Sequence, residues 1–442
     1  MSVPGRSSMQ FIHAGAIYAM ANIASAAVPF LLLPLLTRVL GPAEYAHIVS
    51  FALLVTLCLT VVGLNAHAVL GVVWFTLPRE EIPAFTGTAL GLAVGSTVIM
   101  APTVAAILWL FPNVGGGISP AWGAAAALTA GATVILQCRL VLWQSQHRPI
   151  PNAVLQFTAS LLNVGLSLVA VLVFGWGGDG RNAGIVVANA LMACIAIGLF
   201  IGARETRWAP DRAQLRTIIT FGAPLIVHTL AAVLLSTSDR WAVSLKLGPR
   251  ALGVYGVGAQ LGMVMAILAD AFVKAFGPWL YAKITSPDPD DKHSAVGAIY
   301  TAMPAFVCMA AVVGVVLHLI SSALLGPQYR AAASVLPFFM LGGAFSGIYL
   351  CTSGLYFVSG RTALLARVTL SSAAIGASLT WVLVSMFGVP GAAIGYAATQ
   401  GVLALLTTTV AMKSFDLPWG DPGKAITIWS RSVLGSLDHQ SA

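Results

Sequence analysis

Residues 183–203 read AGIVVANALMACIAIGLFIGA, an apolar run without a single charged side chain. A helix needs about 20 consecutive, mainly apolar residues to cross the hydrocarbon core of a bilayer, so this run predicts a transmembrane helix. Similar stretches recur on both sides of it. Together they make twelve predicted spans, at roughly 10–36, 45–76, 84–111, 121–143, 152–174, 183–203, 217–245, 251–281, 295–320, 331–358, 364–387 and 390–412.

The composition of the whole chain agrees with these spans. Hydrophobic residues make up 58% of the 442 residues and charged residues only 8%, whereas soluble domains carry about 25% charged residues. Ala, Gly, Leu and Val dominate the spans, which suits close packing of helices in lipid. The alternation of polar and apolar residues typical of membrane barrels is absent from the sequence. We therefore predict an all-α integral membrane protein.

The positive charges are distributed unevenly between the two sides of the predicted spans. With the N-terminus in the cytoplasm, most of the 22 Lys and Arg residues fall on the cytoplasmic side. This bias follows the positive-inside rule, and it accounts for the net charge of +8 without a nucleic-acid partner. An even number of spans then places both termini in the cytoplasm.

A weak internal repeat divides the spans into two sets of six. Under a shift of 207 residues, Leu-Gly-Pro at 40–42 falls on Leu-Gly-Pro at 247–249, and Gly-Ala at 15–16 falls on Gly-Ala at 222–223. Small residues can match by chance, but this shift equals six helices. Parallel repeats are expected to enclose a cavity between two bundles. We predict an N-terminal bundle, a cytoplasmic linker, a C-terminal bundle and a cytoplasmic tail, at residues 1–203, 204–216, 217–413 and 414–442.

Several short motifs resemble a known transporter family. They include Phe-Gly-Ala-Pro-Leu at 221–225, Asp-Arg at 239–240, Leu-Gly-Val-Tyr at 252–255 and Leu-Pro-Leu-Leu-Thr-Arg at 33–38. In these motifs the chain resembles the polysaccharide transporter family of lipid-linked oligosaccharide flippases, including O-antigen flippases, within the multidrug/oligosaccharidyl-lipid/polysaccharide exporter superfamily. The resemblance implies a V-shaped pair of six-helix bundles in the bacterial inner membrane.

The same resemblance implies a substrate and partners. Such proteins move an undecaprenyl-diphosphate-linked oligosaccharide, for example a lipopolysaccharide O-antigen or exopolysaccharide repeat unit, to the periplasmic leaflet by alternating access. The implied partners are this lipid-linked substrate, membrane lipids, and the polysaccharide polymerase and glycosyltransferase machinery. We expect a transporter and no enzyme, with no cofactor and no metal, because neither a phosphate-binding Gly-Lys-Ser/Thr loop nor a metal-ligand spacing occurs in the sequence.

Two other functions stay open. Multidrug antiporters of the same superfamily also have twelve helices but commonly depend on membrane-embedded acids in the first bundle, and no Asp or Glu lies inside the first six predicted spans. A membrane polysaccharide polymerase or ligase needs a sizeable outer loop to hold a catalytic site, and all the predicted outer loops are short. Both functions are therefore disfavoured alternatives.

Polar residues at membrane depth are the candidate substrate-binding site. A charge at the bilayer centre costs at least about 2.5–3.5 kcal/mol, so such residues usually face a cavity or a partner. Asp270 and Lys274 lie four residues apart on one helix face and can pair, either as a structural pair or as a switchable one. Together with Arg139, His67 and Asn65, they predict a basic inner vestibule for a diphosphate. Arg139 can alternatively reach lipid headgroups, and His67 can be a packing residue.

Three polar residues on the seventh predicted span are candidates for gating or ion coupling. Asp239 and Arg240 lie near its outer end, and their side chains point about 100° apart, so they need not pair with each other. A structural role at the outer gate is the alternative for both. His228 lies deeper and can titrate near neutral pH, or it can simply belong to the core.

Overall fold

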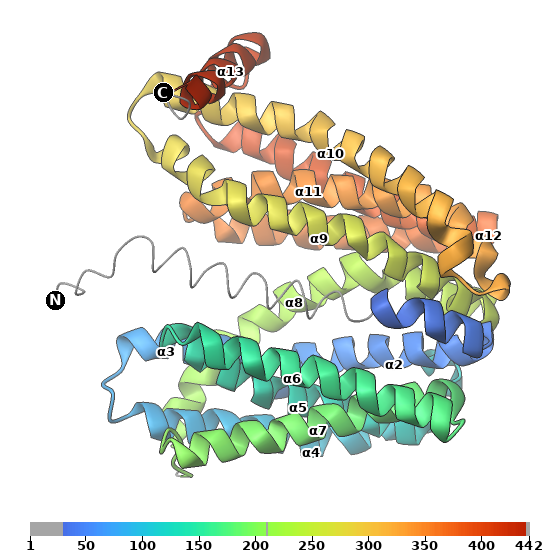
Figure 1. Ribbon diagram of the computed structural model, residues 1–442. Coiled ribbons are helices and arrows are strands. Elements are labelled where there is room, and N and C mark those ends of the chain that lie inside the picture. Colours follow the sequence, from blue (N-terminus) through green and yellow to red (C-terminus); the bar gives the residue numbers. More distant parts are fainter. Residues whose placement is uncertain (1–29, 209–210, 439–442) are drawn as a thin grey trace. The chain divides into compact units, whose positions relative to one another are not determined.

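The computed structural model describes residues 30–208 and 211–438, and every regular element in these two ranges is a helix (Figure 1). Ten of these helices are long and apolar enough to cross a bilayer. A helix satisfies its backbone hydrogen bonds internally, which is why an apolar chain surrounded by lipid adopts this structure.

The longest helix, α12 (Thr362–Ser414), contains two of the predicted spans. Its 53 residues would measure about 80 Å if straight, far more than the ~30 Å hydrocarbon core. The helix breaks at Gly388, where φ is 62° and ψ is −136°, so spans 364–387 and 390–412 follow one another directly. The helix Phe30–Val39 is the described end of the first predicted span, whose other residues lie outside the described ranges. The twelve-helix membrane fold class is therefore confirmed.

The chain folds into two compact units. Unit 1 extends to Leu230 and includes Gly248–Gly253, and unit 2 comprises Ala231–Leu247 together with the chain from Val254 onward. The division therefore falls inside helix α8 (Arg212–Leu247). The sequence predicted the boundary between the two bundles at the connector, residues 204–216. Those predicted domain limits stay a prediction.

Unit 1 contains the first half of α8 and the helices that precede it in the chain. Wholly buried alanines such as Ala89, Ala93 and Ala130 let its helices approach closely, as small residues do in membrane proteins. Its elements after residue 41 are α2 (Pro42–Val61), a 3-10 turn (Val62–Asn65), α3 (Ala66–Thr76), α4 (Ile82–Leu110), a 3-10 turn (Pro112–Gly115), α5 (Pro120–Ser145), α6 (Pro149–Leu168), a π-helical turn (Val169–Val173) and α7 (Gly177–Gly202).

Unit 2 contains the remaining helices. Its last helix, α13, lies along α10 (Figure 1), and in the turn before α13 the Trp419 carbonyl accepts from the Tyr300 hydroxyl of α10 at 2.9 Å. At Gly297 a Cβ atom would come within 2.1 Å of the Ala425 carbonyl oxygen, so only glycine permits this close approach. The elements of unit 2 are the second half of α8, α9 (Pro249–Thr285, mostly in unit 2), α10 (Pro289–Leu324), a 3-10 segment (Pro327–Val335), α11 (Leu336–Val358), α12 and α13 (Pro422–Asp438).

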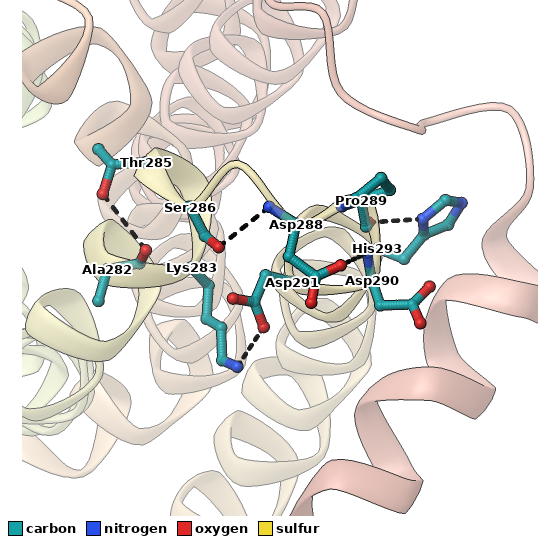
Figure 2. Close-up of polar contacts among 9 residues, drawn as sticks. All are labelled: Ala282, Lys283, Thr285, Ser286, Asp288, Pro289, Asp290, Asp291 and His293. Carbon is teal, nitrogen blue, oxygen red and sulfur yellow. Dashed lines mark hydrogen bonds and ion pairs between the residues drawn. The ribbon is translucent and has the colours of Figure 1, made fainter.

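Polar contacts organise the turn between α9 and α10, which Figure 2 shows. The Lys283 ammonium pairs with the Asp291 carboxylate across the turn. The Asp288 side chain caps α10 by accepting from the Asp290 N–H at 2.9 Å, and the Asp288 N–H donates to the Ser286 hydroxyl at 3.2 Å. The Asp288 cap satisfies one of the backbone donors that the start of a helix leaves free.

Candidate functional site

A basic cavity lies at the start of α8, within unit 1. Its volume is about 710 Å³, and its lining consists of Arg212, Ala213, Arg216, Thr217, Thr220 and Phe221. Arg212, Arg216 and Thr220 are spaced by four residues and form one row along the helix. The cavity therefore combines two exposed guanidinium groups with two threonine hydroxyls.

Contacts with α4 hold the beginning of α8 in place. Asp211 caps the helix by accepting from the Ala213 N–H at 3.0 Å. The Thr88 hydroxyl of α4 donates to the Gln214 side-chain oxygen at 2.9 Å. These contacts cap and anchor the first turn of α8, from which the exposed Arg212 and Arg216 extend.

The connector before α8 packs closely on α4. The Arg207 N–H donates to the Pro83 carbonyl at 2.8 Å. A Cβ atom at Gly87 would come within 2.0 Å of the Arg207 carbonyl oxygen, so α4 needs a glycine there. This part of the predicted cytoplasmic linker is thus attached to unit 1.

Arg139 lies on α5 and is enclosed, with only 1% of its side chain exposed. Its guanidinium donates to the Glu205 carboxylate and lies over the rings of Trp143 and Phe200, at 4.3 and 4.7 Å from their centroids. Gln146 donates to the other Glu205 oxygen at 2.6 Å. The sequence predicted Arg139 as part of a basic inner vestibule, and this conformation encloses its side chain beside the Glu205 carboxylate, a counter-charge that the sequence did not reveal. Its substrate-binding role stays a prediction.

The second predicted span is a broken helix, where the sequence predicted a continuous one over 45–76. α2 ends at Val61 and α3 begins at Ala66, and Gly63, Leu64 and Asn65 between them all have positive φ, at 71°, 47° and 55°. Such a conformation is costly for residues other than glycine and persists only when the surrounding structure supports it.

Two neighbouring helices of unit 1 support this break. The Gly63 N–H donates to the Ser96 hydroxyl of α4 at 2.9 Å. At Gly222 of α8, a Cβ atom would come within 2.0 Å of the Leu64 carbonyl oxygen. Gly222 follows Phe221 of the basic cavity, so the cavity and the break lie next to each other along α8.

The predicted site residue Asn65 lies in this break, and His67 lies just after it in α3. The Asn65 Nδ2 and the His67 Nδ1 are buried and have no hydrogen-bond partner among residues 30–208 and 211–438. Buried polar atoms are normally paired, so unpaired ones at a helix break are candidates for contact with a ligand. The break that carries Asn65 thus contacts α8 at Gly222, one residue after the last residue that lines the cavity, and both lie in unit 1.

Lys274 and Asp270 lie on α9 in unit 2. Their side chains pair at 2.6 Å, as the spacing of four predicted, and 67% and 51% of these side chains are exposed. α9 is one continuous helix, whereas the span that the repeat places opposite it is broken. A role for this pair in substrate binding stays a prediction.

The three gating candidates lie on α8 in different surroundings. Asp239 is buried and accepts a hydrogen bond from the Tyr255 hydroxyl of α9 at 2.6 Å. Arg240 donates to the Ser236 carbonyl of its own helix at 2.6 Å, so the two neighbours do not pair, as their directions predicted. His228 is exposed. Their gating or coupling roles stay predictions.

Sequence reasoning missed the residues of the α8 cavity and the Glu205 carboxylate. Arg212 and Arg216 counted only toward the charge bias of the cytoplasmic side, although their spacing of four residues already put them on one helix face. No pattern in the sequence links Glu205 to Arg139, because the contact is tertiary. Within 30–208 and 211–438, no three His, Cys, Asp or Glu side chains gather as metal ligands would.

Comparison with known proteins identifies relatives. Residues 92–282 match the family described as polysaccharide biosynthesis protein. A protein of the Lsg locus of Haemophilus influenzae is 27% identical over 273 residues, which cover 60% of this chain and 64% of that relative. The matched region thus spans just under two thirds of the relative's length.

Solved structures share the fold. An inward-facing multidrug resistance transporter of the MATE family, in the MOP superfamily, matches with a TM-score of 0.71 and 14% identity, over 89% of this chain and 97% of that one. The lipid II flippase MurJ, in an inward closed conformation, matches with a TM-score of 0.70 and 12% identity, over 95% and 91%. The resemblance predicted from the motifs is therefore confirmed: this chain is a multi-pass membrane protein that shares its fold with the MATE-family transporter and with MurJ, and its residues 92–282 match the family described as polysaccharide biosynthesis protein.

Proposed function

We propose that this chain is a flippase that moves an undecaprenyl-diphosphate-linked oligosaccharide across the bacterial inner membrane by alternating access. The observation that carries the proposal is the basic cavity of α8, where Arg212 and Arg216 lie one turn apart. Guanidinium groups bind phosphate oxygens in a bidentate manner, so this pair suits a diphosphate. The match to the polysaccharide biosynthesis family supports a sugar-bearing substrate, an O-antigen or exopolysaccharide repeat unit.

Polar groups in and near the cavity suit the sugar that is attached to the diphosphate. Thr217 and Thr220 offer hydroxyls to phosphate or sugar. Beyond Gly222, the broken helix offers the unpaired Asn65 and His67 nitrogens to sugar hydroxyls. Broken helices line the substrate sites of many transporters. In this proposal the diphosphate binds at the arginines and the sugar reaches toward the break.

Arg139 acts in this proposal as a positioning residue. Through Glu205 it holds the connector that leads into α8, so it influences the cavity without lining it. Asp270 and Lys274 form an exposed, switchable pair in unit 2, while Asp239, Arg240 and His228 control the outer gate or the coupling ion.

The proposal also covers the orientation of the chain in the membrane and the source of energy for transport. Both termini lie in the cytoplasm, and the α8 cavity opens on the cytoplasmic side, where the lipid-linked repeat is made. An ion gradient or the membrane potential drives the cycle. Glycosyltransferases supply the substrate and a polymerase consumes it, and this chain transports it without catalysing a reaction.

The test is translocation by the purified protein in vesicles that contain a fluorescent, lipid-diphosphate-linked oligosaccharide. The doubly substituted variant Arg212→Gln/Arg216→Gln should lower the rate at which the sugar reaches the opposite leaflet by about tenfold or more, because charge-assisted hydrogen bonds contribute about 1.5–3 kcal/mol each. Arg431→Gln, an exposed arginine on α13, is the matched control and should leave the rate unchanged. Equal rates for the double variant and the wild type would contradict the proposal.

A multidrug exporter is the second candidate, because the fold matches such a protein at a TM-score of 0.71. This function predicts that expression of the chain raises drug resistance in a host that lacks its own exporters. It also predicts that no lipid-linked sugar is moved in the vesicle assay. Resistance without sugar translocation would therefore favour the exporter.

A further inference from the structure

An apolar cavity lies on the surface of unit 2, between α10 and α11. Its volume is about 490 Å³, within the ~300–1,000 Å³ of typical ligand pockets. Its walls include Val307, Ala311, Gly314, Val315, Pro337 and Met340. The helical rise of 1.5 Å per residue makes its length along α10 about 18 Å, which is close to the thickness of one leaflet of a ~30 Å hydrocarbon core.

A second cavity, more polar than the first, continues it at the end of α10. It measures about 360 Å³ and shares His318 and Leu319 with the apolar cavity. Ser321, Ser322 and Arg330 complete its lining. We call the two cavities together the α10–α11 trench, which is apolar along most of its length and basic at one end.

The basic end of the trench has no counter-charge in the described protein. Arg330 is exposed and forms no ion pair with any residue of 30–208 or 211–438. The sequence contains no Asp or Glu between Lys292 and Phe415, a stretch that covers nearly all of α10 and all of α11. The adjacent Tyr329 is wholly buried and fixes the 3-10 segment that carries Arg330. The Arg330 guanidinium is therefore available to bind an anion from outside the protein.

The surroundings of the trench are those of a lipid-facing surface. Leu319 is 71% exposed and Val315 is 60% exposed, and both lie on a helix that is apolar enough to span a bilayer. Exposed aliphatic side chains on such a helix meet hydrocarbon. A water-soluble anion would fill the basic end and leave the apolar part empty. A ligand that fills the whole trench therefore needs both an anionic group and an apolar chain.

We propose that the α10–α11 trench binds one anionic phospholipid, with an acyl chain along α10 and its phosphate at Arg330. Gly314, His318 and Ser322 are spaced by four residues and so form one row along the helix, from the apolar part to the polar end. The Ser322 hydroxyl and the His318 ring lie where the phosphate and the glycerol would be. This inference is independent of the proposed transport function, because it concerns the surface of unit 2 alone.

The test is native mass spectrometry of the full chain extracted from nanodiscs that contain equal amounts of phosphatidylglycerol and phosphatidylcholine. The wild type should retain phosphatidylglycerol in preference to phosphatidylcholine, and Arg330→Gln should lower this preference about tenfold, the effect of losing one charge-assisted hydrogen bond. Arg250→Gln, an exposed arginine at the start of α9, should keep the preference. Gly314→Leu should reduce retention of both lipids, because its side chain fills the apolar part beside Met340.

Three results would overturn the assignment. The first is an unchanged preference in Arg330→Gln, and the second is an equal loss in Arg250→Gln, which would show a general effect of surface charge. The third is complete displacement of phosphatidylglycerol by equimolar undecaprenyl phosphate, which would make the trench a site for the carrier lipid. Melting temperatures of all variants, measured alongside, distinguish lost binding from lost folding.

Discussion

The guanidinium of Arg139 donates to the carboxylate of Glu205, 66 residues further along the chain, and so attaches the connector after α7 to the core of unit 1. Glu205→Ala should destabilise the protein by about 3–5 kcal/mol, because it leaves a buried cation without its partner. The double variant Arg139→Met/Glu205→Met should cost much less, since no charge stays buried. Thermal unfolding in one detergent measures both, and a Glu205→Ala protein as stable as the wild type would show that the pair contributes nothing.

The helix break in the second span should be sensitive to the residue at Gly63. Gly63→Ala should destabilise the protein by about 1–2 kcal/mol or more, since a left-handed backbone disfavours a Cβ atom and this atom would come within 2.7 Å of Val134. Adding Val134→Ala should recover the share of the lost stability that is due to the clash. The share due to the left-handed backbone at residue 63 should remain. The measurement is again the melting temperature.

The control for the break is Gly165 of α6, which has no neighbouring atom within 4 Å of an added Cβ. Gly165→Ala should be neutral or slightly stabilising, because alanine favours helices. If Gly63→Ala behaved in the same way, the left-handed turn would not be required by the fold.

The buried carboxylate of Asp239 should depend on its hydrogen bond from Tyr255. One of its oxygens accepts from the Tyr255 hydroxyl, and the other has no partner in the part of the chain that the structure describes. Tyr255→Phe should therefore cost about 1.5–3 kcal/mol, whereas Asp239→Asn/Tyr255→Phe should cost less because the buried charge is gone. A double-mutant cycle on melting temperature shows the coupling, and strictly additive effects would contradict it.

The pair of Lys274 and Asp270 should matter for transport more than for stability. Both side chains are more than half exposed, and such pairs on one helix stabilise by only about 0.3–0.5 kcal/mol. Lys274→Ala should therefore leave the melting temperature nearly unchanged while it lowers the translocation rate. A variant with full transport activity would identify the pair as purely structural.

Local features of the site were predictable from the sequence where they depend on spacing along one helix. The pairing of Asp270 with Lys274 follows from their separation of four residues, and the separate directions of Asp239 and Arg240 follow from their adjacency. The number of spans likewise follows from apolar length, because lipid leaves a chain few alternatives to helices.

Tertiary features were not predictable in the same way. The break at Gly63 lies inside an apolar run with no proline, and it depends on Ser96 of α4 and on the close approach of Gly222. The enclosure of Arg139 depends on Glu205, which lies in a segment that reads as a linker. In both places, contacts with residues distant in the sequence determine the structure, and the local pattern does not.

Helix α8 contributes its first half to unit 1 and its second half to unit 2. The start of α9 also belongs to unit 1 and the rest of it to unit 2, so α8 and α9 are the two helices that pass from one unit to the other. Pro224, inside α8, removes one backbone hydrogen bond and lowers the local stiffness. The segment of α8 around Pro224 should therefore bend more easily than the rest of the helix, and its stiffness would limit how freely the two halves of α8 move.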